Sequence, residues 1–257
     1  MLDRIAAVLL LVLVPLMLGL GAVRLWGVPM YETLPSFAHA GGAIGKATYI
    51  NGLSALDNSY ASGFRDFEID FERTSDGWIV CGHDWALFGN RVPDFTAFLA
   101  RRATMQYPVC TYDELVAWFR RHRDSTLIPD AKIDVALVVP ALEASLGGQV
   151  LPEVYSREDL ASLGGEGHSP LVLALYKQTG FFRRLDLIMA AHGQGTQFAA
   201  VAMSGADAMF GLALWAKLWL RAPVYVYTVD SCNAAFLLRA AGVDAVFTDS
   251  LGANACR

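Results

Sequence analysis

Eight short apolar runs with the character of β-strands recur between residues 36 and 249, and segments with helix signatures separate them. Strands that alternate with helices form parallel βαβ units, and eight such units favour a (βα)8 TIM barrel over an open doubly wound sheet. We therefore predict one α/β barrel domain. The predicted strands are SFAHAG (36–41), DFEIDFE (66–72), TLIPDAKID (126–134), VLPEVYS (150–156), PLVLALYK (170–177), QFAAVAM (197–203), PVYVYTV (223–229) and DAVFTD (244–249).

Several segments between these strands begin with residues that cap helices. Thr111 and Glu114 form a capping box, and Ser156 and Ser231 each precede a further helical segment. A hairpin that turns at residues 75–77 is the addition we expect to the repeating pattern. No Gly-rich phosphate loop leads from a strand into a helix, so we expect no nucleotide cofactor.

The composition suits a globular protein with a substantial core and excludes nucleic acid as a partner. Of the 257 residues, 54% are hydrophobic, and 20 Lys and Arg against 25 Asp and Glu give a net charge of −5 without any basic cluster. The four cysteines are too few for a disulfide-rich scaffold, and their spacing matches no zinc motif. They allow one disulfide and require none.

An uncharged apolar segment, residues 5–23, lies near the start of the chain between Arg4 and Arg24. It is just long enough to span a bilayer core of roughly 30 Å. A cleaved signal peptide is the competing interpretation, but the run is long for one and no clear cleavage site precedes Arg24. We expect a membrane anchor or signal segment over 1–28, a linker over 29–35 and the barrel domain over 36–257.

The location of the barrel depends on this segment. We expect a membrane-anchored protein with its barrel outside the cytoplasm, or a secreted one if the segment is cleaved. The two flanking arginines nearly balance, so the positive-inside rule gives little guidance, and an anchored domain that faces the cytoplasm is the alternative.

The second predicted strand carries four acids on one face. Its alternation separates three apolar residues from Asp66, Glu68, Asp70 and Glu72. Taken alone, this pattern is typical of an antiparallel strand with one solvated face. In a barrel, however, side chains at the carboxyl ends of the strands converge on one pocket, so these acids would point into the barrel mouth.

Other polar residues fall at or just beyond the predicted strand ends. Glu68, Asp70 and Asp130 offer only oxygen ligands, which suit a hard divalent cation such as Mg²⁺ or Ca²⁺. Two histidines beside such an ion supply a general base and a general acid, and a lysine can neutralise a phosphate. Together these groups predict cleavage of a phosphodiester. The remaining polar residues of this set are His39, His83, Lys132, Glu153, Lys177 and Tyr227.

Four stretches of the chain resemble the glycerophosphodiester phosphodiesterases and the related phosphatidylinositol-specific phospholipase C-like barrels. FAHAGG at 37–42 resembles the family's H-R-G opening, and Asn51, Gly63 and the E-x-D at 68–70 follow at similar spacing. TSDGWIVCGHD resembles T-x-D-G…H-D, and YVYTVD…AAGVDAVFTDS resembles the closing W-T-V-N…G-V-D-x-I-x-T-D. The likeness covers residues 36–250.

The resemblance implies roles for individual residues. His39 and His83 would be the acid–base pair. Glu68 and Asp70 would be metal ligands, and Asp130 and Lys132 would match the family's E-x-K. We further expect Lys132 to be a catalytic residue together with the two histidines, and the substrate to be contacted by Lys132, Glu153, Lys177 and Tyr227.

Some positions differ from the family pattern. Ala40 stands where the family has a phosphate-contacting arginine, Asp130 is one methylene shorter than the usual glutamate, and Tyr227 and Asp230 replace tryptophan and asparagine. These differences point to an altered substrate or to lost activity.

The leading hypothesis is a metal-dependent phosphodiesterase that hydrolyses a glycerol- or polyol-phosphodiester, whether a glycerophosphodiester, a phospholipid or a glycerol-phosphate polymer. Its two histidines would act as acid and base. The alternatives are a metal-independent phospholipase C-like lyase and a catalytically silent, membrane-tethered barrel that binds phosphodiesters.

Overall fold

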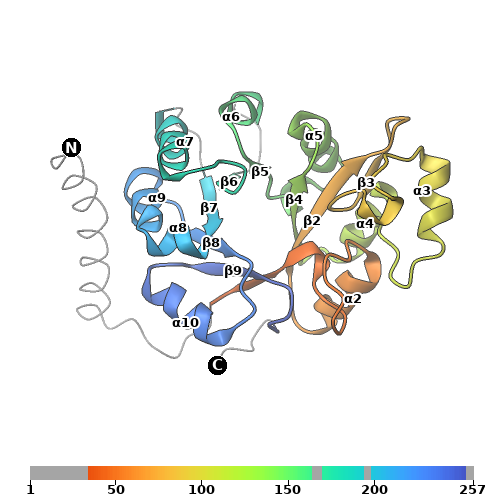
Figure 1. The fold of residues 1–257 in the computed structure, drawn as a ribbon, viewed down its shortest axis with the longest axis horizontal. Helices are drawn as coiled ribbons and strands as arrows, with labels where there is room; N and C mark the ends of the chain where they lie inside the picture. The colour runs from red at the N-terminus through yellow and green to blue at the C-terminus, as the bar shows by residue number, and fades with distance from the viewer. Residues whose placement is uncertain (1–33, 164–169, 194–197, 253–257) are drawn as a thin grey trace.

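A computed structural model describes residues 34–163, 170–193 and 198–252 of the protein. Within these ranges nine strands form one sheet, and eight of them coincide with the predicted strands (Figure 1). The eight are β1 (Ser36–Ala38), β2 (Asp66–Arg73), β4 (Thr126–Ala131), β5 (Glu153–Val154), β6 (Leu171–Ala174), β7 (Phe198–Ser204), β8 (Val224–Tyr227) and β9 (Ala245–Thr248).

The eight strands form a barrel-like α/β fold. They pair in parallel in the order β4-β2-β1-β9-β8-β7-β6-β5. At the two ends of this order, β4 meets the segment before β5 through a parallel bridge between Leu127 and Val150. The predicted α/β barrel is confirmed at this level.

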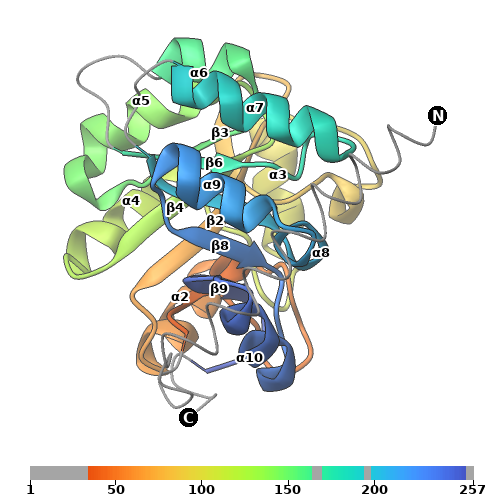
Figure 2. The same ribbon diagram turned by 90° about the vertical axis from the view of Figure 1, so that its left-hand side faces the viewer.

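Helices lie around the outside of the strands (Figure 2). Buried apolar residues from both layers make one large core, which includes Phe67 of β2 and Trp118 of α4. The helices are α2 (Leu53–Ala61), α3 (Phe95–Arg102), α4 (Tyr112–Arg121), α5 (Val135–Leu146), α6 (Arg157–Leu163), α7 (Phe181–Gly193), α8 (Gly205–Met209), α9 (Leu212–Leu220) and α10 (Cys232–Ala240), with short 3-10 turns η1 (His39–Gly41), η2 (Ala86–Phe88) and η3 (Gly147–Gln149).

The predicted helix starts are found, with one difference. Thr111 and Glu114 form both hydrogen bonds of the capping box at the start of α4. The Ser156 hydroxyl accepts a hydrogen bond from the backbone N–H of Asp159 at 3.0 Å, which caps α6. Ser231 stands at the N-cap of α10, but its side chain makes no capping hydrogen bond.

The middle of strand β2 is buried on both faces, so a solvated face is the wrong interpretation of Glu68 and Asp70. Phe67 packs edge-on against Trp118 and Phe119 of α4, which places the apolar face toward the helix layer. Glu68 and Asp70, on the other face, are only 4% and 1% exposed. Asp70 lies opposite Asp130 in the register between β2 and β4. The alternation therefore points acids into the barrel, as the strand-end argument predicts.

The predicted hairpin is the start of a larger excursion between β2 and α4. Strand β3 (Ile79–Cys81) pairs antiparallel with β2, and η2 and α3 follow it. Val80, Phe98 and Val109 form a small core of their own, and a disulfide joins Cys81 to Cys110. The excursion fixes the segment that contains His83 beside the barrel mouth.

The predicted anchor and most of the linker lie outside the described residues. Within the described ranges, no helix combines the length and the apolar character that crossing a bilayer requires.

Candidate active site

A pocket of about 150 Å³ lies at the carboxyl ends of the strands and collects most of the predicted site residues. β1 ends directly before His39 and β4 directly before Lys132, so chain direction alone brings both side chains to the mouth. Asp70 is too buried to line the pocket, and Lys177 is not among the lining residues. The predicted residues that do line it are His39, Glu68, His83, Asp130, Lys132, Glu153 and Tyr227.

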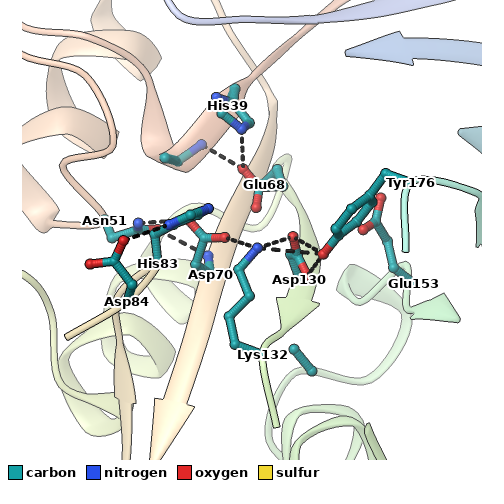
Figure 3. Close-up of polar contacts among 12 residues, drawn as sticks. His39, Asn51, Glu68, Asp70, His83, Asp84, Asp130, Lys132, Glu153 and Tyr176 are labelled. Carbon is teal, nitrogen blue, oxygen red and sulfur yellow. Dashed lines mark hydrogen bonds and ion pairs between the residues drawn. The ribbon is translucent and has the colours of Figure 1, made fainter. Parts of the chain in front are cut away.

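Three buried carboxylates form a cluster at the base of this pocket, where Glu68 and Asp130 line it and Asp70 does not (Figure 3). One oxygen from each of Glu68, Asp70 and Asp130 lies within 4.8 Å of the other two. Glu68 accepts a hydrogen bond at Oε2 from the backbone N–H of Ala40 at 2.6 Å, while its Oε1 is buried without a partner in the described structure. Three buried carboxylates with converging oxygens fit a hard divalent cation.

Asn51 holds Asp70 in place. Its amide nitrogen donates to Oδ2 of Asp70 at 2.8 Å, and its amide oxygen accepts from the Asp70 backbone N–H at 2.9 Å. Asn51 is fully buried and has a φ of 49°, a left-handed conformation that asparagine tolerates better than most residues. The asparagine that the family resemblance singled out is therefore a positioning residue for an acid of the cluster.

Lys132 lies between two of the three acids. Its ammonium is 2.8 Å from Oδ1 of Asp70 and 2.6 Å from Oδ2 of Asp130. Burial alone would lower the pKa of Lys132, but the charges of Asp130 and Asp70 outweigh it and raise that pKa. The lysine is therefore a fixed positive charge in the mouth of the barrel.

The surroundings shift the pKa values of Glu68, Glu153 and Asp130 in different directions. Burial, reinforced by the charge of Asp70, raises the pKa of Glu68 to about 8. Burial likewise raises the pKa of Glu153, with the charges of Asp130 and Glu68 adding to it. Burial also opposes ionisation of Asp130, but Lys132 outweighs it and lowers the pKa of Asp130. Proton uptake by a carboxyl of this cluster is what crowding predicts.

His39 is oriented by an acid from the other end of the chain. Its Nδ1 lies 2.7 Å from Oδ1 of Asp249, and its Nε2 lies 3.9 Å from Oε2 of Glu68. Burial lowers the pKa of His39, but the charges of Glu68 and Asp249 outweigh it and raise the pKa to about 9. One ring nitrogen is thus held by a carboxylate while the other points toward the acid cluster.

His83 stands across a tyrosine from His39. The ring of Tyr49 lies edge-on to both histidines, with centroid distances of 4.8 Å to each. His83 is exposed, and its Nδ1 lies 3.3 Å from Oδ2 of Asp84. The two histidines therefore flank the pocket rather than contact one another.

Of the three other predicted substrate ligands, Glu153 and Tyr227 line the pocket and Lys177 does not. Glu153 accepts a hydrogen bond from the Tyr155 hydroxyl at 3.2 Å, and the buried Tyr227 hydroxyl has no partner in the part of the chain that the structure describes. The Lys177 ammonium donates to the carbonyl of Ala131 at 2.8 Å and lies over the Tyr155 ring. Glu153 and Tyr227 thus reach the pocket, whereas Lys177 is turned toward the backbone.

Four residues that complete the site were not predicted. The hydroxyls of Tyr155 and Tyr176 donate to Oδ1 of Asp130 at 2.7 and 2.8 Å, and Tyr49 and Asp249 position the histidines. The T-D ending carried a signal for Asp249. Tyr155 and Tyr176 carried none, because tyrosine on a predicted strand usually indicates packing. Tyr49 carried none either, because it lies in a loop outside the predicted strands.

Comparison with solved structures gives the fold a name. A glycerophosphodiester phosphodiesterase from Parabacteroides distasonis matches with a TM-score of 0.67 and 16% identity, over 85% of this chain and 93% of that one. One from Agrobacterium tumefaciens matches with a TM-score of 0.65 and 17% identity, over 87% and 100% of the two chains. The chain has the fold of the glycerophosphodiester phosphodiesterases. This confirms the resemblance at the level of fold.

A third similar structure was solved with a ligand bound to it. A phosphodiesterase from Oleispira antarctica, solved in complex with its product sn-glycerol-3-phosphate, matches with a TM-score of 0.64 and 17% identity over 87% of this chain and 95% of that one. No protein-family model and no curated protein matches the sequence. The likeness therefore lies in the fold that these glycerophosphodiester phosphodiesterases share with the chain.

Proposed function

We propose that this protein is a metal-dependent phosphodiesterase that hydrolyses a glycerol- or polyol-phosphodiester. The observation that carries the proposal is one pocket in which Glu68 and Asp130 meet His39 and His83, with Asp70 directly beneath. The glycerophosphodiester phosphodiesterase fold supports it, and so does the glycerol-phosphate product bound by the Oleispira neighbour.

Glu68, Asp70 and Asp130 would hold the cation, and their oxygen donors favour Mg²⁺ or Ca²⁺. When bound, such an ion supplies positive charge that stabilises the phosphate oxygens during displacement. The crowding of these buried carboxyls supports the assignment, because a cation would relieve their mutual repulsion.

The chain's own residues supply the proton transfers and the positioning. One histidine takes a proton from the attacking oxygen, and the other gives a proton to the leaving alkoxide. Asp249 fixes the orientation of the His39 ring through its contact with Nδ1. The Lys132 ammonium lines the pocket and neutralises phosphate charge. Ala40 cannot do this, because it stands directly after His39 where the family has an arginine.

Glu153 and Tyr227 would hold the hydroxyls of the glycerol or polyol. Both line the pocket, and the Tyr227 hydroxyl has no partner among the described residues. Substrate binding by Lys177 stays a prediction. In the structure its ammonium donates to the backbone carbonyl of Ala131 instead.

We also propose that the barrel is anchored through residues 5–23 and works outside the cytoplasm. The apolar sequence of that segment supports the anchor. The disulfide between Cys81 and Cys110 supports the compartment, because disulfides persist in oxidising environments and are rare in the cytosol.

A metal-independent phospholipase C-like lyase is the second candidate. Lys132 favours it, because the ammonium already pairs with Asp70 and Asp130 and so supplies positive charge beside the phosphate site. Such an enzyme uses a neighbouring substrate hydroxyl as its nucleophile and leaves a cyclic phosphate.

Phosphorus NMR of the products separates the candidates. The purified protein is incubated with Mg²⁺ or Ca²⁺ and a panel of glycerophosphodiesters, phospholipids and glycerol-phosphate polymers. We expect a glycerol phosphomonoester as the end product. A cyclic phosphate that accumulates would support the lyase, and no turnover of any panel member with either metal would favour the silent binding barrel.

A further inference from the structure

One side of the barrel exposes a group of large apolar side chains. Helices α7, α8 and α9 form this side, and α9 packs against the other two (Figure 2). Of the fourteen large apolar side chains that are exposed in the described ranges, six lie on these helices or directly after α8: Phe182, Met189, Met209, Phe210, Leu218 and Trp219. Exposed apolar side chains that gather on one side mark an interaction surface, and we call these six the apolar face.

Two arginines and a pair of tryptophans accompany the apolar face. Trp219 stacks on the half-buried Trp215, one helical turn earlier, with ring centroids 6.0 Å apart. Arg183 on α7 and Arg221 directly after α9 are exposed, and neither makes an ion pair or a hydrogen bond within the described ranges. Tryptophan and arginine are the side chains that gather where the headgroups of a bilayer meet its acyl chains.

The charge of this side is opposite to that of the whole protein. Residues 181–222 carry four basic side chains and two acidic ones, although the chain has a net charge of −5. Both acids are already paired, Asp186 with Arg157 and Asp207 with Arg184. This side therefore presents unpaired positive charge beside exposed apolar side chains, which suits a partner that is both anionic and apolar.

The proposed anchor ends close to the barrel. Ten residues, 24–33, separate the apolar segment 5–23 from Leu34, where the described structure begins. Ten residues span at most about 36 Å when fully extended. The anchor would thus hold the barrel within reach of the bilayer surface, where even a weak contact forms readily because it is intramolecular.

We propose that the apolar face docks on the surface of a bilayer that contains anionic lipids, with Arg183 and Arg221 at the headgroups. This docking rests on the anchor proposed above and is independent of the reaction. A second copy of the chain would bring its own unpaired arginines against these two, and the uncharged segment 5–23 would cover them without pairing them. Anionic headgroups pair them. None of the six residues lines the candidate active-site pocket, so a docked barrel keeps its pocket free.

The test measures contact between Trp219 and lipid in the full-length protein. The protein is reconstituted into vesicles of phosphatidylcholine with phosphatidylglycerol, and its tryptophan fluorescence is compared with and without bromine on the acyl chains. Trp219→Phe is the reference, because its difference from the wild type isolates this ring from the other five tryptophans. We expect brominated lipid to quench the wild type more than Trp219→Phe.

The two arginines should control this contact. Arg183→Ala and Arg221→Ala are each expected to lower the ratio of docked to undocked protein, taken from the Trp219-specific quenching, by roughly fivefold, the usual effect of one basic residue at an anionic surface. Arg121→Ala is the matched control. It removes an exposed arginine from α4, which lies away from α7 and α9, and it should leave the ratio unchanged (Figure 1).

Equal quenching of the wild type and Trp219→Phe would overturn the proposal, whether or not the protein stays on the vesicles through an alkaline carbonate wash. If Trp219 is then also shielded from aqueous iodide, a second copy or segment 5–23 covers the face instead. Trp219-specific quenching in a protein that carbonate removes would uphold the docking face and count against the anchor alone. An equal loss in Arg121→Ala would contradict pairing of the two arginines with headgroups.

Discussion

Replacing His39 or His83 by alanine is expected to reduce turnover by roughly 10²- to 10⁴-fold, the usual effect of removing an acid or base. The two rings flank one pocket from either side of Tyr49, so neither can take over the other's proton transfer. Turnover is measured at saturating diester, and a thermal melt of each variant shows that it remains folded.

An exposed histidine provides the control for this pair. His192 lies on α7 and does not line the candidate active-site pocket, so His192→Ala should leave the rate unchanged. A variant of His39 or His83 that retains the wild-type rate would remove that residue from the acid–base pair.

The second large effect is stabilisation of the fold by a divalent cation. A ligand that binds only the folded state at a hundredfold excess over its Kd adds about 2.7 kcal/mol to the free energy of unfolding. For a domain of this size that corresponds to a rise in Tm of roughly 5 to 10 °C. The measurement is a thermal melt in Mg²⁺, in Ca²⁺ and in EDTA.

Variants assign this stabilisation to the acid cluster. Asp70→Asn and Asp130→Asn should abolish the metal-dependent rise in Tm, because each removes one of the converging charges. Asp66→Asn, two residues along the same face of β2 from Glu68, is the matched control and should keep it. An equal loss in Asp66→Asn, or no rise with any divalent ion, would exclude the cluster as a metal site.

The strand pattern predicted the barrel-like fold because each strand must present a buried face to the helices. The eight apolar runs became eight strands, although most are shorter than their runs. SFAHAG, for example, is extended only to Ala38, and a 3-10 turn then takes His39 across the mouth. An apolar run shows which residues are buried, but not where the backbone hydrogen bonding between strands ends.

The site was predicted wherever a residue's role follows from its position on a strand. Glu68, Asp70 and Asp130 are together because β2 and β4 are neighbours in register. The contact between His39 and Asp249 spans 210 residues, and it depends on β1 pairing with β9. A local pattern cannot show such a pairing.

Loops and long side chains were less predictable. Tyr49 lies in a loop with a φ of 53°, and its place between the histidines comes from that backbone conformation. Lys177 follows β6 at the expected end of the sheet, yet its flexible stem turns the ammonium toward the Ala131 carbonyl. Residue position fixes the Cα, whereas the end of a lysine side chain is set by the partners available to it.

The central claim is that the acid cluster, through a divalent cation, and the two histidines together cleave a phosphodiester. The most direct measurement is the hydrolysis rate of a glycerophosphodiester by the full-length protein, first in EDTA and then with Mg²⁺ or Ca²⁺ added back. We predict that the rate is lost in EDTA and restored by one of the two ions in the wild type but not in Asp70→Asn. A rate that is unchanged by chelation in the wild type would contradict the account.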